Sequence, residues 1–367
     1  MAKQEHKQPL VHIVKRGAIP TKKAVAIRAA AIAIALVLCG IIAMVLAKTN
    51  PLKIYGAMLK GAFGTPNKIW DLLQNIAILL CISLAVTPAF KMKFWNCGAE
   101  GQVLIGGLGA VTVMYFIGGK VAYPILLVLM VAASILAGII WALIPAIFKA
   151  QWNTNETLFT LMMNYIATQL VAFCLKDWVK TGSGVLSPME QYGLPKIGHR
   201  YLLNIIIVFA LTVGMYIYLK YSKQGYEISV VGESEKTAKY IGINVKKVII
   251  RTLLVSGAVC GIAGLLLVGG TDHTITTTTV GGRGFTAIMV SWLAKFDPIV
   301  MALTTFLVVF LQKGSTQMQY DFGINSSVAD IITAIILFFI IGCEFFINYK
   351  VVFRKKEGSA VKEAEQK

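Results

Sequence analysis

Long apolar runs separated by short basic loops constrain this chain more than any other feature. A spanning α-helix needs roughly 20 consecutive apolar residues. The sequence is 57% hydrophobic and only 14% charged, whereas a typical soluble domain has about 25% charged residues. We therefore predict an all-α polytopic membrane protein with about ten transmembrane or re-entrant helices. The candidate segments are 26–47, 69–90, 97–117, 122–148, 157–175, 201–219, 248–270, 284–294, 298–312 and 327–349.

Two of these segments, 284–294 and 298–312, are too short to span a membrane comfortably. The sequence "KFDP" joins them, and its proline suits the first turn of a helix. We expect two short or re-entrant segments that form one hairpin.

The basic residues predict the orientation of the chain. Segments 1–25 and 350–367 are rich in Lys, and basic segments of this kind remain in the cytoplasm. Termini on one side require an even number of crossings, ten or eight. The membrane domain is then 26–349, with outer loops 48–68 and 176–200 and an inner loop 220–247.

The first outer loop carries apolar residues about one helical turn apart, so we expect it to lie on the membrane surface. These residues are Leu52, Tyr55, Leu59 and Phe63.

Several classes of function are excluded by what the sequence lacks. The net charge of +18 is distributed over loops and ends and forms no continuous basic face, which argues against nucleic acid. No P-loop, H-E-x-x-H, G-x-S-x-G or C-x-x-C motif occurs. We expect no cofactor, no metal and no catalytic activity in this chain.

Polar residues in or beside the apolar segments are the functional candidates, because ionisable groups are costly inside a membrane. The carboxylates are too few for a proton relay. The acidic residues are Asp71, Glu100, Glu156, Asp330 and Glu344, and the amides are Asn75, Gln102, Asn155 and Asn164.

The stretch "NCGAEGQVLIGG", which contains Glu100, allows two interpretations. In the first, the glycines permit close helix contact and Glu100 hydrogen-bonds the end of a neighbouring helix. In the second, a broken helix presents this carboxylate to a translocation cavity.

The stretch "WNTNETLFTLMMNYIA" poses a similar choice. Thr154 or Asn155 can cap the following helix, with Glu156 stabilised in its first turn. Asn164 lies deeper, where a buried amide needs partners that a hydroxylated or amide-bearing ligand could supply.

The inner loop contains a short predicted helix over 233–241, bounded by Gly232 and Gly242 as stop signals. Ala238 and Ile241 fall on one face of it. The rest of its surface carries Glu235, Lys236 and Lys239.

Three stretches together resemble bacterial ABC-importer permeases of the branched-chain amino acid, ribose and nucleoside family. They are "FWNCGAEGQVLIGG", "TNETLFTLMMNYIA" and "GRGFTAIMVSWLAKFDPI", and the resemblance covers roughly residues 25 to 350. Within the family, the chain is most similar to the nucleoside permeases that work with basic-membrane-protein lipoproteins.

The resemblance implies a multi-pass permease in the bacterial cell membrane, surrounded by lipid and built from two inverted halves. It also implies three protein partners: an ABC ATPase subunit, a second related permease and an extracytoplasmic substrate-binding lipoprotein. ATP binding and hydrolysis by the ATPase would rock the permease between inward-facing and outward-facing states.

The same resemblance places an ATPase-coupling helix in the inner loop. The family pattern is Glu-Ala-Ala followed by a glycine, which corresponds to Gly242. This sequence departs from the pattern, since Glu235 is one residue early. The coupling candidates are Gly232, Glu235, Lys236, Thr237, Ala238 and Gly242.

Nothing in the residues alone separates a nucleoside from a ribose-like sugar, because amides can bond the hydroxyls of both. A nucleobase adds a stacking surface for Phe285 or Trp292. The substrate-path candidates are Asn75, Glu100, Gln102, Asn155, Asn164 and Phe285. The alternatives to a nucleoside permease are an ABC permease for simple sugars, an ion-coupled secondary carrier, and a membrane scaffold or enzyme.

Overall fold

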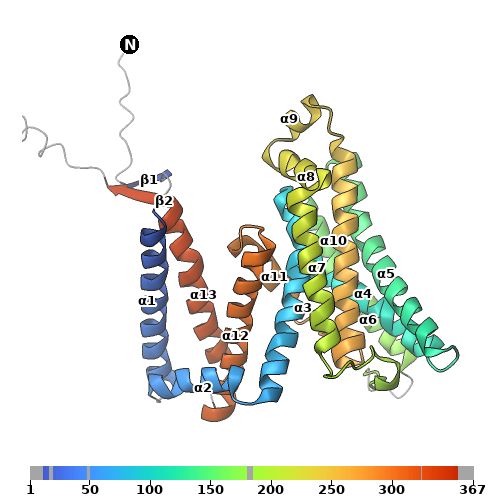
Figure 1. Cartoon of the computed structure of the whole chain (residues 1–367), viewed down its shortest axis with the longest axis horizontal. Coiled ribbons are helices and arrows are strands. Elements are labelled where there is room, and N and C mark those ends of the chain that lie inside the picture. Colours follow the sequence, from blue (N-terminus) through green and yellow to red (C-terminus); the bar gives the residue numbers. More distant parts are fainter. Residues whose placement is uncertain (1–10, 16–19, 48–49, 180–184, 324, 354–367) are drawn as a thin grey trace, which may run out of the picture. The chain divides into compact units, whose positions relative to one another are not determined.

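A computed structural model describes residues 11–15, 20–47, 50–179, 185–323 and 325–353. Their contacts divide the chain into two compact units, one made of 1–61 with 311–367 and the other of 62–310 (Figure 1).

The 1–61 and 311–367 unit pairs the two ends of the chain. Its elements are β1 (Val11–Lys15), α1 (Thr21–Ala47), α2 (Pro51–Phe63), the second half of α12 (Pro298–Phe322), α13 (Ser326–Asn348) and β2 (Tyr349–Phe353). Helix α1 packs against α13. Strand β1 pairs antiparallel with β2, with Val11 opposite Phe353 and Lys15 opposite Tyr349. This two-strand ladder, which was not expected from the sequence, brings the segment before α1 beside the segment after α13, so the two ends of the chain lie together. The pairing therefore supports an even number of crossings.

Helix α2 exposes the apolar face predicted for the first outer loop. Leu52, Leu59 and Phe63 are exposed, as an interfacial helix requires. Tyr55 is the exception, because its hydroxyl turns inward and donates to the Leu36 carbonyl of α1.

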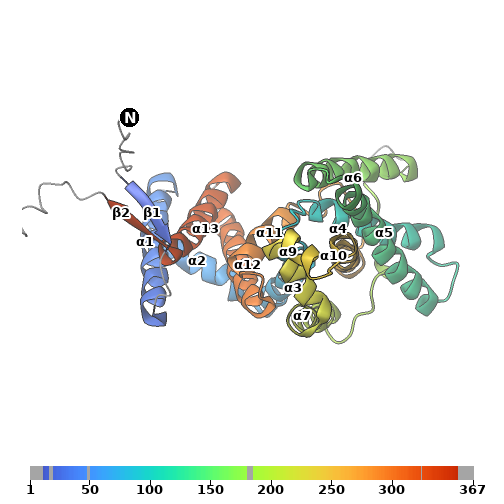
Figure 2. The ribbon, with the colours of Figure 1, turned by 90° about the horizontal axis from the view of Figure 1, so that it is seen from above.

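The 62–310 unit is a helical bundle built around α10. Its elements are α3 (Pro66–Lys91), α4 (Ala99–Ile117), α5 (Tyr123–Trp152), α6 (Glu156–Trp178), η1 (Glu190–Tyr192), α7 (Leu202–Tyr221), α8 (Lys223–Glu233), α9 (Glu235–Tyr240), α10 (Val245–Leu267), η2 (Val268–Asp272), α11 (Arg283–Leu293) and the first half of α12. Figure 2 shows α10 surrounded by α3, α4 and α5, and it packs against all three.

Small residues allow α4, α5 and α10 to approach closely. A Cβ on Gly106 of α4 would lie 2.6 Å from the Cα of Gly261 on α10. The hydroxyl of Ser134 on α5 lies 2.8 Å from the Gly106 carbonyl oxygen and 2.6 Å from that of Gly261. Helices in a membrane associate through such small-residue contacts, since lipid gives no hydrophobic drive.

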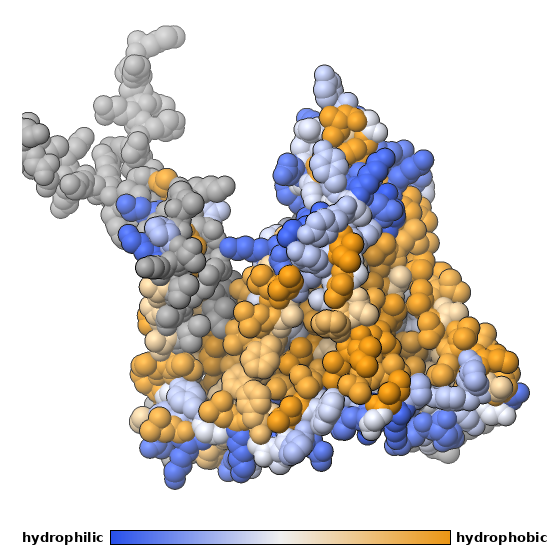
Figure 3. All heavy atoms as spheres, in the orientation of Figure 1, coloured by the Kyte–Doolittle hydropathy of each residue, from blue (hydrophilic) through white to orange (hydrophobic). Residues whose placement is uncertain are grey.

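Seven helices among the described residues are long and apolar enough to span a membrane, namely α3, α4, α5, α6, α7, the continuous α10–η2 segment and α12. Helices α1 and α13, of 27 and 23 residues, occupy the first and last predicted segments. On the face of the 62–310 bundle that Figure 3 shows, hydrophobic residues cover the middle and hydrophilic residues gather at the two ends. The predicted all-α polytopic fold is confirmed, while the inverted halves stay a prediction.

The predicted short hairpin is right for its first member and wrong for its second. Helix α11 has 11 residues and cannot span alone. Helix α12 has 25 residues and continues past 312 to Phe322. The prediction stopped early because "QKGSTQMQYD" is polar, although it remains helical.

The second outer loop is tied to the end of α10–η2. The Met189 amide donates to the His273 carbonyl at 2.8 Å, and the Leu194 amide to the Gly269 carbonyl at 2.8 Å. The His273 ring is buried under this loop. Burial lowers its pKa from the ordinary value of 6.5, and the nearby positive charge of Arg200 acts in the same direction.

Acidification should therefore destabilise this loop. A histidine whose pKa is lowered by folding takes up its proton first in the unfolded chain, so its contribution to stability is lost as pH falls below about 6.5. We expect the melting temperature of the purified protein to fall less between pH 7.5 and 5.5 in His273→Gln than in the unmodified protein. His199→Gln is the matched control, because His199 is only partly buried and stacks on the Trp70 ring. Equal pH slopes in all three proteins would contradict this role for His273.

Candidate functional site

The start of α4 is held by side chains of α6. The side-chain oxygen Oδ1 of Asn164 accepts from the Gly101 backbone amide at 2.9 Å, and its side-chain nitrogen Nδ2 donates to the Cys97 backbone carbonyl at 2.9 Å. One turn earlier, the Thr160 hydroxyl accepts from the Cys97 amide at 3.1 Å. Since Gly98 offers no side chain to cap α4, Asn164 replaces the missing cap.

Glu100, in the first turn of α4, binds the N-terminus of α11. Its Oε1 accepts from the Gly282 amide at 2.7 Å and its Oε2 from the Gly284 amide at 2.7 Å. Both are short, charge-assisted hydrogen bonds, and the carboxylate faces the positive end of the α11 dipole. The first interpretation of "NCGAEGQ", in which Glu100 bonds the end of a neighbouring helix, is confirmed.

The glycines of "GGRG" make this contact possible. Gly281 and Gly282 have φ angles of +61° and +77°, which only glycine adopts readily. Gly284 is needed for space, because a Cβ there would lie 2.5 Å from the Glu100 amide nitrogen.

Gly284→Ala should separate α11 from Glu100. Overpacking a tight contact typically costs about 1–3 kcal/mol, so we expect a lower melting temperature. Gly56→Ala is the matched control, because a Cβ at Gly56 meets nothing within 4 Å. The steric assignment would be wrong if the two variants melted at the same temperature.

Arg283 lies between the two amides that Glu100 binds. One guanidinium nitrogen donates to the Thr279 carbonyl at 3.2 Å, and the other donates to Asn75 Oδ1 at 3.3 Å. The Asn75 amide donates in turn to Asp71 Oδ1 at 3.1 Å. Asn75 and Glu100, two of the predicted site residues, are thus brought to the same end of α11.

The side chains of two other predicted amides, Gln102 and Asn155, form hydrogen bonds within the protein. Gln102 is buried and exchanges hydrogen bonds with Asn96, at 3.2 and 3.3 Å, and Asn96 also donates to Ser256 at 3.2 Å. Asn155 caps α6 by accepting from the Leu158 amide at 3.1 Å. The predicted cap is confirmed, and Glu156 also pairs with Lys149 at 2.8 Å.

Three residues of the site, Asn96, Thr160 and Arg283, were not predicted from the sequence. Thr160 lies four residues before Asn164, so one helical face carries both. Arg283 stood in the quoted "GRGF" stretch. Asp330 and Glu344 lie on α13, and their side chains are outside the described residues.

Helix α11 exposes aromatic residues along one face. Phe285 and Trp292 are 49% and 45% exposed and lie seven residues, or two turns, apart. Trp292 stacks on Trp95 with ring centroids 5.5 Å apart. In the single chain, Phe285 is therefore the freer stacking surface.

The inner loop forms two helices where one was predicted. Helix α8 runs to Glu233, Ser234 caps α9 by accepting from the Thr237 amide at 3.2 Å, and α9 is Glu235–Tyr240. Gly232 is not a stop signal, because it lies within α8, where a Cβ would be 2.2 Å from the Lys91 carbonyl oxygen. The prediction mistook a glycine of close packing for a helix boundary.

Gly242 does end α9, as predicted. Its φ is +85°. The Gly242 amide donates to the Lys239 carbonyl at 3.1 Å, and the Ile243 amide donates to the Ala238 carbonyl at 2.9 Å. These bonds form a Schellman motif, which favours glycine at this position.

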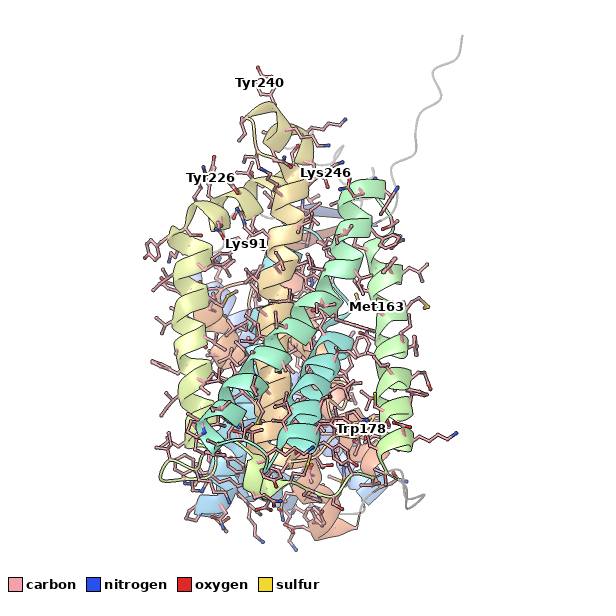
Figure 4. All side chains as sticks on the ribbon, turned by 90° about the vertical axis from the view of Figure 1, so that its right-hand side faces the viewer. Lys91, Met163, Trp178, Tyr226, Tyr240 and Lys246 are labelled. Carbon is pink, nitrogen blue, oxygen red and sulfur yellow. The ribbon has the colours of Figure 1, made fainter. Side chains whose placement is uncertain are left out.

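The surface of α9 is divided between an anchored side and an exposed tip. Ala238 is buried in an apolar cluster with Met92, Ala150 and Val245. Ile241, predicted on the same face, is instead 51% exposed, and Tyr240 is 92% exposed at the tip of the bundle (Figure 4). Glu235, Lys236 and Thr237 are also exposed. The tip has the apolar side chains and projection that suit docking to a partner.

No group of three or more His, Cys, Asp or Glu residues that could hold a metal ion occurs among the described residues. Two features of the described residues are the functional candidates. One is α11, whose N-terminus is held by the Glu100 carboxylate, and the other is the projecting helix α9.

Comparison with known proteins defines the class. The family model described as the permease component of the branched-chain amino acid transport system matches residues 69–341. The chain is 30% identical over 320 residues to the guanosine ABC transporter permease protein NupP of Bacillus subtilis, covering 83% of this chain and 89% of that protein.

Two further relatives are named for the transport of glucose and of nucleosides. The glucose ABC transporter permease protein TsgB13 of Haloferax volcanii is 27% identical over 330 residues, covering 85% of this chain and 86% of that protein. The nucleoside ABC transporter permease protein NupB of Lactococcus lactis is 27% identical over 321 residues, covering 83% and 87%.

The fold and these matches define a multi-pass permease subunit of an ABC transporter, a transport component of the cell membrane. The chain belongs to the family of branched-chain amino acid transport system permease components.

Proposed function

We propose that this chain is the permease of an ATP-driven importer of nucleosides. The observation that carries the proposal is α11, a helix too short to span, whose N-terminus is held by Glu100 and whose exposed face carries Phe285. Short helices of this kind line substrate paths in transporters. Two relatives that are named as guanosine and nucleoside permeases support the choice.

In this proposal, Phe285 and Asn75 are the residues that contact substrate. Phe285 offers an exposed ring for the nucleobase. Asn75 lies near the α11 N-terminus and can bond ribose hydroxyls when its contact with Arg283 opens. Gln102, Asn155 and Asn164 act indirectly, by holding α4 and α6 in place.

The partners follow from the family. ATP hydrolysis belongs to a separate ABC ATPase that docks on the α9 tip. A second related permease completes the path, and an extracytoplasmic binding lipoprotein delivers substrate. The path closes and opens as α9 transmits the movement of the ATPase to α10.

Uptake by cells with and without the gene tests the substrate. We expect deletion to abolish uptake of radiolabelled guanosine and adenosine and to leave glucose and ribose uptake unchanged. The glucose permease among the relatives makes a simple sugar the second candidate. Loss of sugar uptake with unchanged nucleoside uptake would favour that candidate and reject the first.

A further inference from the structure

The inner ends of α5, α6 and α10 border two adjoining grooves of opposite character. One groove, of about 560 Å³, is lined by Lys149, Gln151 and Asn153 from the end of α5, by Lys239 of α9, and by Lys246 of α10. The other, of about 460 Å³, runs along the outward face of α6 and is lined by Leu158, Phe159, Met162, Met163 and Ile166.

The turn between α5 and α6 joins the two grooves. Asn153 lines the polar groove, and the next two residues, Thr154 and Asn155, line the apolar one. The ion pair of Lys149 with Glu156, at 2.8 Å, crosses the same turn. A ligand with one polar end and one apolar end can therefore lie across the turn.

The charge of the polar groove favours an anion. Lys246 donates to Gln151 at 3.2 Å, which directs its ammonium group towards the groove. One acidic residue, Glu235, lines this groove together with Lys239 and Lys246, whose two positive charges exceed its single negative charge. The third lysine of the groove, Lys149, is neutralised by its ion pair with Glu156. The net local charge is positive. In Figure 4, Lys246 lies near the end of the bundle from which α9 projects, and Met163 lies further along towards the opposite end.

Aromatic residues mark the depth at which the two grooves meet. Trp152 is 66% exposed at the end of α5. The Phe148 ring lies 5.1 Å from the Trp152 ring and 5.0 Å from the Phe159 ring, centroid to centroid. Tryptophan with one apolar and one wet side is typical of the membrane interface.

We propose that these grooves bind one anionic phospholipid, with its phosphate beside Lys246 and an acyl chain along α6. Basic pockets between membrane helices on the cytoplasmic side bind anionic headgroups in this way. The lipid would touch both α9 and the α5–α6 turn, so its binding would fix the coupling helix against the bundle.

Native mass spectrometry of the full chain, purified in detergent and mixed with equal amounts of dioleoyl phosphatidylglycerol and dioleoyl phosphatidylcholine, tests this site. We expect preferential retention of phosphatidylglycerol. Lys246→Ala should lower that retention about fivefold, since one lysine near an anionic surface contributes about a factor of five. Lys247→Ala is the matched control, because Lys247 is exposed and lies outside the groove.

Four results would overturn the proposal. Equal retention of the two lipids would show that the protein has no preference for an anionic headgroup. Equal losses of lipid in the Lys246 and Lys247 variants would show that the groove is not the binding site. Displacement of phosphatidylglycerol by soluble glycerol phosphate would show a phosphate site without a lipid site. The groove would belong to the ATPase if Lys246→Ala weakened co-purification of the ATPase and left lipid retention unchanged.

Discussion

Glu100→Gln should release the N-terminus of α11 and abolish most transport. A glutamine oxygen can accept from only one of the two amides, and its NH₂ group then faces the other N–H donor. Hydrogen bonds to charged groups contribute about 1.5–3 kcal/mol. A loss of about 2 kcal/mol changes the ratio of held to released helix by roughly 30-fold. We expect a lower maximal uptake rate with an unchanged KM, measured after the amount of protein in the membrane is matched.

Two further variants sharpen this test. Glu100→Asp keeps the charge but is one methylene shorter, so it should recover only part of the activity. Glu190→Gln is the control, because Glu190 lies in an outer loop and its side chain is 61% exposed. A raised KM with unchanged thermal stability in Glu100→Gln would mean that Glu100 contacts substrate instead of α11. Unchanged uptake and stability would contradict both roles.

Tyr240→Ala combined with Ile241→Ala should uncouple the permease from its ATPase without unfolding it. Both side chains are exposed, so removing them costs the fold little. Aromatic residues that fill a partner's pocket contribute about 2 kcal/mol or more to binding. We expect co-purification of the ATPase to fall by roughly 30-fold or more and nucleoside uptake to fall with it.

The matched control for the α9 tip is Tyr226→Ala. Tyr226 is also exposed, but it lies on α8, away from the tip (Figure 4). Its loss should change neither ATPase binding nor uptake. Wild-type affinity for the ATPase in the Tyr240 and Ile241 double variant would contradict the docking assignment.

The membrane helices could be predicted because their signal is local. Apolar runs such as 69–90 and 201–219 coincide closely with α3 and α7. The end of α12 could not be predicted from hydropathy, because its last three turns are polar but remain helical. The β1–β2 ladder was also missed, since it joins residues more than 330 positions apart.

The site was predicted in part for similar reasons. The cost of placing a carboxylate near a membrane segment identified Glu100, and the structure supplies its partner, the amides of 282 and 284. The first of these amides is 182 residues from Glu100. Both are backbone groups, which almost every residue carries, so the sequence does not identify them as partners. Gly232 and Gly242 show the same limit, because one glycine serves packing and the other a helix end.

Reconstitution of the permease with its ATPase in liposomes tests whether ATP drives nucleoside transport through this chain. Radiolabelled guanosine transport would be followed with ATP, with a non-hydrolysable ATP analogue, and with an imposed proton or sodium gradient alone. We expect transport with ATP only, and loss of this transport in the Tyr240 and Ile241 double variant. Transport driven by an ion gradient without ATP would contradict this expectation.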